Sequence, residues 1–421
     1  MKKSLFAVAA LSAIAGAAQA QSSVTVYGIL DVGYVGYNTR VATGSTQSSQ
    51  AVNKTTGNAF SSSGESTSRL GFKGTEDLGG GTSAFFTVEI GVTPNSAQNI
   101  STSGTSNRQT FAGLKKNGIG QFALGTQYTV VHNAVAATDP GQANNIAGNV
   151  IYPAITEGVG GTENSTGAAY TVRTNNQLSV NSDTFAGFQV NGMLVANNKN
   201  QNETITVSGT TTTSTGGLNN QNGWGLGVNY TFQKFYATVN YQALTSKQST
   251  QTVNTAGTTL ATWLPAGAPA TGYAGGASAP GTNVQDNQFY VAATYDFGIL
   301  KAYAQYITRK VSAQQDNTYY LKRSGEQIGV RSFITPTIEA WASGGLGRYQ
   351  GYGANTANLT AWQIGSNYWL SKRTNLYAIY GMTGTSNASF PTAVNGAAVN
   401  TNINPASTNI SNYAVGIRHT F

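Results

Sequence analysis

The sequence predicts an all-β fold, a transmembrane antiparallel β-barrel of sixteen strands, and three observations support this prediction. Segments of about ten residues alternate apolar with polar or small side chains along most of the chain. The connections between these segments alternate between short turns and long polar stretches. After the N-terminal leader, no run of about 18 or more apolar residues occurs, which excludes membrane-spanning helices. A closed barrel is then the architecture that can pair every backbone group inside lipid.

The first twenty residues are predicted to be a cleaved signal peptide. Lys2 and Lys3 precede an apolar stretch, Leu5 to Ala18, that is too short to cross a membrane. Ala18-Gln19-Ala20 is a cleavage site of small residues, so residues 1–20 are removed and 21–421 form a single barrel domain. The protein is therefore expected to leave the cytoplasm.

The alternation by itself does not separate a barrel from a soluble β-sandwich. Phe235, Val239 and Tyr241 alternate with Thr238 and Asn240, and a period of two places the two sets on opposite faces of a strand. In a sandwich the apolar face would be the core, whereas in a membrane barrel it meets lipid and the polar face meets the lumen. Tyr and Trp also recur near segment ends, where amphipathic rings prefer the headgroup level.

Connection length favours the barrel, because short turns on one rim and long loops on the other are typical of outer-membrane proteins. The short turns are Glu76–Gly81, Lys116–Gly118, Ser182–Ala186, Gln233–Lys234, Phe297–Gly298, Thr335–Pro336 and Ser371–Arg373. The long stretches are Asn38–Glu65, Pro94–Asn107, Tyr128–Thr166, Asn197–Asn222, Lys247–Asp286, Ser312–Lys322, Gln350–Asn358 and Thr385–Ile410. Seven turns and eight loops join sixteen strands, a number that leaves an aqueous channel, where about eight strands would fill with side chains.

The composition excludes several classes of protein. Charged residues make up only 9% of the chain, against about 25% in ordinary soluble domains, yet 22 Tyr and 16 Phe argue against disorder. The absence of cysteine removes thiolate nucleophiles and thiolate metal sites. The net charge is +8, but no basic run or helix is present to bind nucleic acid, so no nucleic-acid partner is expected. In a pore, a cationic bias would favour anions.

Several motifs resemble the trimeric general-diffusion porins of Gram-negative outer membranes, in particular the β-proteobacterial porin family. These motifs are the segments 23–31 (SVTVYGILD), 68–80 (SRLGFKGTEDLGG), 111–115 (FAGLK), 368–374 (YWLSKRT) and 413–421 (YAVGIRHTF), which span the mature chain in family order. The resemblance implies a sixteen-stranded barrel in the cell outer membrane, a homotrimer, and a third external loop folded into the pore. That loop would be Tyr128–Thr166. The chain departs from the family at Leu124-Gly125-Thr126, where an arginine is common.

The candidate pore residues follow from alternation and from the resemblance. Arg69 and Lys73 lie opposite Leu70 and Phe72 on one segment and should face the lumen. By resemblance, Arg69 joins Arg108 and Arg173 in a basic cluster. Strict alternation places Arg108 on the same face as Leu114, so its lumen position requires a β-bulge.

Carboxylates supply the opposite charge at the pore. The resemblance places Asp139, Glu157 and Glu163 of the third loop opposite the basic cluster. Asp31 and Glu89 lie on polar faces of their strands and are expected to pair with nearby lysines and arginines. A channel selects by the width of its constriction and by the charges that line it. Alternatively, each arginine is a solvated charge at the rim or pairs with a loop carboxylate.

The last segment places Tyr413, Val415, Ile417 and Phe421 on one face together with His419. In outer-membrane barrels such a terminus with a final Phe resembles the signal read by the assembly machinery. The expected partners are therefore two further copies of the chain, that assembly machinery, the lipid bilayer with its lipopolysaccharide, and small anionic or neutral solutes.

The leading function is a water-filled channel for passive diffusion of small hydrophilic solutes and ions, with a preference for anions. The alternatives are a substrate-specific channel for phosphate or small carboxylates, and an outer-membrane adhesin. An enzyme is not expected, because His132 and His419 are the only imidazoles and no local catalytic arrangement accompanies them. No metal ligands occur at a recognisable spacing, and no cofactor is expected.

Overall fold

The structure is a computed structural model of the chain. It describes residues 23–43, 51–95, 107–153, 170–208, 211–248, 282–314, 320–351, 356–388, 392–394, 397–399 and 406–421. The signal peptide expected at residues 1–20 lies outside these residues. Within them, no helix is long and apolar enough to cross a membrane.

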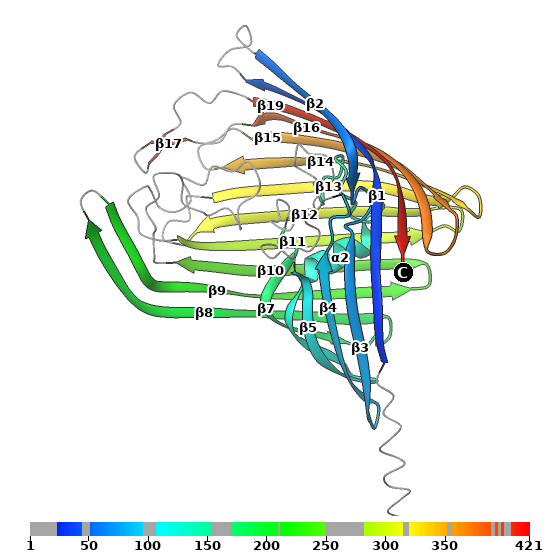
Figure 1. Ribbon diagram of the computed structural model, residues 1–421, viewed down its shortest axis with the longest axis horizontal. Helices are drawn as coiled ribbons and strands as arrows, with labels where there is room; N and C mark the ends of the chain where they lie inside the picture. The colour runs from blue at the N-terminus through cyan, green and yellow to red at the C-terminus, as the bar shows by residue number, and fades with distance from the viewer. Residues whose placement is uncertain are drawn as a thin grey trace, which may run out of the picture.

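Antiparallel strands make up nearly all of the described chain, and they form one sheet that closes into a barrel (Figure 1). The strands are β1 (Ser23–Thr43), β2 (Ala51–Ser62), β3 (Arg69–Gly79), β4 (Thr82–Gly91), β5 (Asn107–Lys116), β6 (Gly120–Tyr128), β7 (Arg173–Ser182), β8 (Phe188–Ser208), β9 (Thr211–Phe232), β10 (Phe235–Gln248), β11 (Thr282–Asp296), β12 (Lys301–Ala313), β13 (Tyr320–Phe333), β14 (Ile338–Gly351), β15 (Ala357–Trp369), β16 (Thr374–Ala388) and β19 (Ala406–Thr420). β17 (Thr392–Val394) and β18 (Ala397–Val399) form a separate hairpin, and the helix α2 (Val130–Thr138) follows β6.

The barrel has sixteen strand positions, as the sequence predicts, because two of the seventeen described strands share one position. β3 pairs with the first part of β1, from Ser23 to Ile29, and β2 pairs with the later part, from Val32 to Thr43. β2 and β3 therefore act as one barrel strand that is interrupted by residues 63–68.

The first and last strands close the barrel. β1 pairs with β19 from Ile29–Thr420 to Ala42–Ser407, so the sheet has no free edge there. Beyond this ladder, Gly28 and Phe421 exchange both backbone hydrogen bonds, each at 3.1 Å. A side chain at Gly28 would meet the ring of Phe421 and the carbonyl oxygen of Arg69, so this close approach requires glycine.

The two faces of the sheet differ as the alternation predicts. On β13, Ile328 is 70% exposed and Val330 is also exposed, whereas Arg323 and Gln327, which belong to the alternate set of residues on this strand, are buried. The exposed face carries large apolar side chains around most of the barrel and is the lipid-facing wall. The polar face points inward, where other parts of the chain cover it.

Two of the stretches expected to be loops are mostly strand. β1 continues to Thr43 and β2 begins at Ala51, within the expected loop Asn38–Glu65. β8 and β9 likewise pair through most of Asn197–Asn222 and reach Ser208 and Thr211. The pattern missed these extensions because a strand that projects beyond the membrane has water on both faces and needs no apolar side.

The contact at the closing point gives a testable prediction. Gly28→Ala should destabilise the barrel by about 1–3 kcal/mol, because the added methyl group forces Phe421 and the backbone of Arg69 apart. The urea midpoint of the detergent-solubilised barrel, read from the loss of its β circular dichroism, measures this. Gly192→Ala is the matched control, since a Cβ at Gly192 meets only ordinary contacts at 3.9 Å. Equal midpoints for the two variants would contradict the closing role of this contact.

Candidate functional site

The described parts of the segment between β6 and β7, residues 129–153 and 170–172, lie on the inner side of the barrel. Its helix α2 contacts β10 and β11 (Figure 1), and Val131 and Val135 pack in a buried cluster with Leu244, Tyr290 and Ile307. Thr129 caps the helix, because its side-chain oxygen accepts a hydrogen bond from the backbone N–H of His132. A segment rich in small apolar residues is thereby buried inside a barrel whose inner wall is polar.

Inward-facing glutamines hold the backbone of this segment. Gln288 accepts from Thr171 N at 2.7 Å, and Gln327 accepts from Val150 N at 2.9 Å. Gln363 donates to the carbonyls of Ile146 and Ala147 at 2.9 and 3.0 Å. Gln242 and Gln305 make corresponding contacts to Val131 N and to the carbonyl of Thr138. Amide side chains carry both donors and acceptors, so they can pair with an irregular backbone on either side.

Asp139, which the resemblance places at the pore, is held among side chains and backbone of the wall and loop. The side chain is buried, and its carboxylate accepts from Ala143 N at 2.7 Å, from Asn149 Nδ2 at 2.8 Å and from Gln327 Nε2 at 3.0 Å. Burial raises the pKa of this carboxyl group. Asp139 therefore anchors the turn after α2 to the wall. Glu157 and Glu163 lie outside the described residues.

A second inward segment, residues 63–68, meets the first one. Asp31 holds it, since its carboxylate accepts from the backbone N–H groups of Glu65 and Ser66 at 2.8 and 2.6 Å. Asp31 also accepts from the Tyr377 hydroxyl at 2.6 Å, so the expected pairing with a lysine or arginine was wrong. Asn145 donates from its backbone and side chain to the carbonyls of residues 64 and 63. The break between β2 and β3 thus forms part of the narrowed interior.

The predicted arginines gather at one corner of the wall, around Glu89. Arg108 donates to Glu89 at 2.7 Å and to the Tyr128 hydroxyl at 2.6 Å, and it is 2% exposed. Arg69 lies 3.9 Å from the same carboxylate and is partly exposed. The expected pairing of Glu89 is therefore confirmed.

A β-bulge brings Arg108 to this corner. Glu89 pairs with Gln109 but Ile90 pairs with Asn107, so the register shifts at Arg108. Without this shift, Arg108 would share the outward face with Leu114, which is exposed. A bulge inserts one residue and re-aims its side chain, so the inward position that alternation seemed to forbid is reached.

Arg173 lies on the other side of Tyr128. Its guanidinium group stands 5.6 Å from the centre of that ring, and the ring packs against His132 at a tilt of 41°, with centroids 4.3 Å apart. Burial, together with the charges of Arg173, Arg108 and Arg69, lowers the pKa of His132 to about 3. The imidazole is therefore neutral at physiological pH and lies within the electrostatic influence of all three guanidinium groups.

Lys73 lies on the same inward face, nearer the short-turn rim. It is exposed, and its ammonium group stands 5.4 Å from the ring centre of Tyr27, which donates to Glu89. Lys73 thus approaches the corner through Tyr27, which links it to Glu89.

Three further arginines line the opposite wall, and the sequence analysis missed them. Arg309 binds Asp286 with both partners buried, Arg331 binds Glu339, and Arg323 donates to the carbonyl of Val150. Arg331 also donates to the carbonyl of Pro140 at 2.7 Å. The alternation of side chains indicates that Arg323 and Arg331 face the lumen, because they alternate with the outward Ile328 and Val330.

The C-terminal residues lie where alternation places them. Tyr413, Val415, Ile417 and Phe421 are exposed on the outward face of the closing strand. They form an apolar lipid-facing row next to β1.

Comparisons with known proteins agree with this architecture. The family model "Gram-negative porin" matches residues 7–388. An outer membrane porin protein of Bordetella pertussis is 32% identical over 192 residues, covering 45% of this chain and 46% of that protein. Outer membrane porin protein 32 of Delftia acidovorans is 35% identical over 188 residues, covering 45% and 48%. The chain thus matches about half the length of these curated relatives.

Solved structures cover more of the chain at lower identity. The anion-selective porin from Comamonas acidovorans has a TM-score of 0.63 and 20% identity, covering 95% of this chain and all of that one. The outer membrane protein OmpT of Vibrio cholerae, in its trimer form, has a TM-score of 0.57 and 14% identity, covering 95% and 99%. These structures share the barrel fold.

The anchoring role of Asp139 can be tested by hydrogen exchange. Asp139→Ala leaves three donors without an acceptor, two of them buried, and each buried group costs about 1–3 kcal/mol, so residues 139–151 should exchange at least tenfold faster. Peptide-level exchange measured by mass spectrometry detects this. Glu76→Ala, which removes an exposed carboxylate near a short turn, is the control and should leave these peptides unchanged. Unaltered protection in Asp139→Ala would refute the anchor.

Proposed function

The chain belongs to the Gram-negative porin family and is a multi-pass β-barrel of the outer membrane, and on this basis we propose that it forms a water-filled channel for passive diffusion of small hydrophilic solutes, with a preference for anions. The observation that carries the anion preference is the corner formed by Arg69, Arg108 and Arg173. Among the described residues there, these three cations accompany one carboxylate, Glu89.

Width and charge at the narrowest point determine what such a channel passes. A barrel of sixteen strands is wide enough to leave an aqueous lumen. The segment 129–153 and the break at 63–68 occupy part of that lumen and meet at Asn145. Charges farther than about 8–10 Å from a passing ion are largely screened at physiological salt. The constriction is therefore proposed to set the selectivity.

The charges at the proposed constriction favour the passage of anions. Arginine stays charged at any working pH, and its planar group holds a fixed orientation against Glu89 or Tyr128. Asp139 is buried on the far side of the loop and offers no exposed carboxylate to counter the arginines. The solved porin of similar fold from Comamonas acidovorans is described as anion-selective, and the same preference is proposed here. Lys73 adds a positive charge toward the short-turn rim.

No catalytic function is proposed. His132 is buried beside Tyr128 and Tyr170, and His419 interacts with Thr374 at the end of the last strand. In the described residues, no group of three or more His, Asp and Glu side chains gathers to hold a metal.

The proposed assembly is a homotrimer that is inserted by the outer-membrane assembly machinery. The terminal row from Tyr413 to Phe421 is the proposed assembly signal, because its last residue completes the pairing with Gly28 that closes the barrel. An unclosed strand would expose backbone groups to lipid at several kcal/mol each. Support for the trimer comes from the family and from the trimer form in which the outer membrane protein OmpT of Vibrio cholerae was solved.

The channel proposal predicts large ohmic conductance steps in a planar bilayer, with a zero-current potential in a salt gradient that favours chloride. Arg69→Gln and Arg173→Gln should each shift that potential toward cation preference. The shift should be larger at 0.1 M salt, where the Debye length is about 10 Å, than at 1 M, where it is about 3 Å.

Arg373→Gln is the matched control, since it removes the same charge from an exposed short turn. Preference of the wild type for potassium would overturn the anion assignment. A chloride-preferring current that saturates with phosphate would instead favour a channel with a specific anion site.

The trimer proposal predicts that unheated detergent samples migrate as a compact species of three chains and that heating yields the mature monomer. Crosslinking within intact membranes followed by electrophoresis provides an independent measurement. Light scattering that reports a single chain in mild detergent would contradict the assembly.

A further inference from the structure

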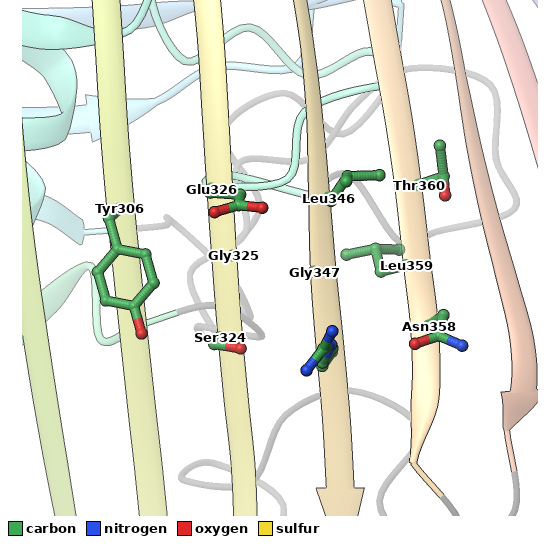
Figure 2. A pocket seen from close by; sticks show the side chains of 10 residues that line it. Tyr306, Ser324, Gly325, Glu326, Leu346, Gly347, Asn358, Leu359 and Thr360 are labelled. Atoms are coloured by element: carbon green, nitrogen blue, oxygen red, sulfur yellow. The ribbon is translucent and has the colours of Figure 1, made fainter.

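The barrel wall has hollows on both of its faces. On the outer face, the side chains of Tyr306, Ser324 and Asn358 line a hollow across β12–β15 and point away from the lumen (Figure 2). A solute in transit through the lumen does not meet that face. On the inner face, a cavity of about 170 Å³ lies between α2 and the strands β4–β8. Such a volume holds several water molecules, so it has room for a small solute.

Strand register explains why the inner cavity is present. One inward-facing row across β5, β6 and β7 consists of Gly113, Ala123 and Ser179. These small residues leave space above the strands, and a Cβ at Gly113 would lie only 2.7 Å from the ring of Phe85. Phe85 meets Phe111 edge to face, with ring centroids 6.3 Å apart, and both rings line the cavity. The cavity thus has a floor of small residues and two aromatic rings at one side.

Hydrogen bonds within the wall hold the back of the cavity. Gln127 donates to the carbonyls of Ala123 and Gln177, each at 3.1 Å. Gln127 also accepts from the Ser179 hydroxyl at 2.7 Å, and Gln177 donates to the carbonyl of Tyr128 at 3.1 Å. The side chains of Gln127, Gln177 and Ser179 are buried. Because these polar groups already have partners, they fix the shape of the cavity on this side.

Four other amide side chains that line the cavity are free to bind a ligand. Gln109, Gln121 and Asn181 are partly buried on the wall, and Asn133 is exposed on α2. These four side chains have no hydrogen-bond partner among the described residues. Each amide offers both donors and an acceptor. Gln121 and Asn181 stand directly opposite each other in the ladder, so they can bind neighbouring groups of one ligand.

The lining of the cavity carries no charged side chain in the part of the chain that the structure describes. Charges lie next to it, since Gln109 pairs in register with Glu89 of the basic corner and Gln121 pairs with Lys115. An anion inside the cavity would lose its water without a cation in the lining to replace it, which is costly. The lining therefore favours a neutral ligand.

We propose that this cavity is a binding subsite for a small neutral solute with several hydroxyl groups, a polyol or a single sugar ring. The inference rests on the proposed channel, because the solute reaches the cavity through the lumen. Gln109, Gln121 and Asn181 bind the hydroxyl groups of the solute, which both donate and accept hydrogen bonds. The rings of Phe85 and Phe111 cover its C–H groups, which are apolar. Amides and aromatic rings together therefore match the two kinds of surface that a sugar presents.

The position of the cavity determines what the subsite does. β6 runs from a short turn before Gly120 to Tyr128 at the basic corner, so the cavity lies on the short-turn side of that corner. The arginines attract anions but give a neutral solute no comparable attraction. The two features therefore separate solutes by charge, since anions are drawn to the guanidinium groups and neutral solutes are held by the amides.

Saturation-transfer NMR of the folded protein in detergent, titrated with glucose, tests the proposal. The wild type should give a saturable signal. Gln121→Met combined with Asn181→Leu removes two free amides at similar side-chain size and should weaken binding at least tenfold. Ala123→Leu, which fills the floor of the cavity and keeps the amides, should weaken it as well. Asn191→Leu is the matched control, because Asn191 pairs in register with Asn181 but does not line the cavity, and should bind like wild type.

Recognition of the hydroxyl groups is read from two further probes. Tetrahydropyran, a ring like that of a sugar but without hydroxyl groups, should bind at least tenfold more weakly than glucose. Equal binding of tetrahydropyran, displacement of glucose by phosphate, or unchanged binding by both test variants would overturn the assignment, as would a wild type without a saturable signal. The β circular dichroism of each variant verifies that its barrel is folded. Bilayer conductance and the zero-current potential of the same samples keep this outcome separate from the channel proposal, since no arginine is changed and both should equal those of the wild type.

Discussion

Pairing of backbone groups in a medium without water is the constraint on which the rest of this structure depends. An unpaired N–H or C=O in hydrocarbon costs several kcal/mol, so a sheet that crosses a membrane must close on itself. The ladder between β1 and β19, completed by the hydrogen bonds of Gly28 and Phe421, provides that closure. Once the sheet is closed, each strand has one face toward lipid and one toward the interior, and the alternation of side chains follows.

The same constraint explains how an irregular segment can fold inside the barrel. Residues 139–153 form no regular ladder, so their backbone groups need side-chain partners. Gln327 on β13 and Gln363 on β15 supply such partners, and Asp139 and Asn149 add others from within the segment. Glutamines on β10, β11 and β12 do the same for the flanking residues Val131, Thr171 and Thr138. The polar inner wall therefore binds the backbone of the loop and also presents polar side chains to water. The interior is narrowed by these polar contacts together with the buried apolar cluster around α2.

The charged side chains are paired differently on the two sides of the barrel interior. On the side of β12–β14, Arg309 and Arg331 are matched by Asp286 and Glu339, and their charges serve packing. On the side of β3–β7, three guanidinium groups surround one carboxylate and two aromatic hydroxyls. Burial, with a smaller contribution from the charges of these arginines, lowers the pKa of His132, so this corner disfavours another positive charge. Arginines occur on both sides of the lumen, so the difference in charge between the two sides arises from how the arginines are paired with carboxylates.

The sequence by itself determined the barrel, its strand number and the direction in which most side chains point. These properties are local or periodic: alternation, short turns and the composition of the outward face can each be read along the chain. The arginines of the basic corner could be proposed from resemblance, and the need for a bulge at Arg108 followed from counting alone. Only the tertiary structure decided that Asp139 is an anchor, that Asp31 holds a backbone segment, and that Gln121 faces Asn181. The physical reason is that burial and partner choice depend on register between strands and on contacts between residues far apart in sequence, such as Asp139 with Gln327. A period of two assigns a residue to a face of the sheet, but it does not specify which residue of another strand or loop will meet it there.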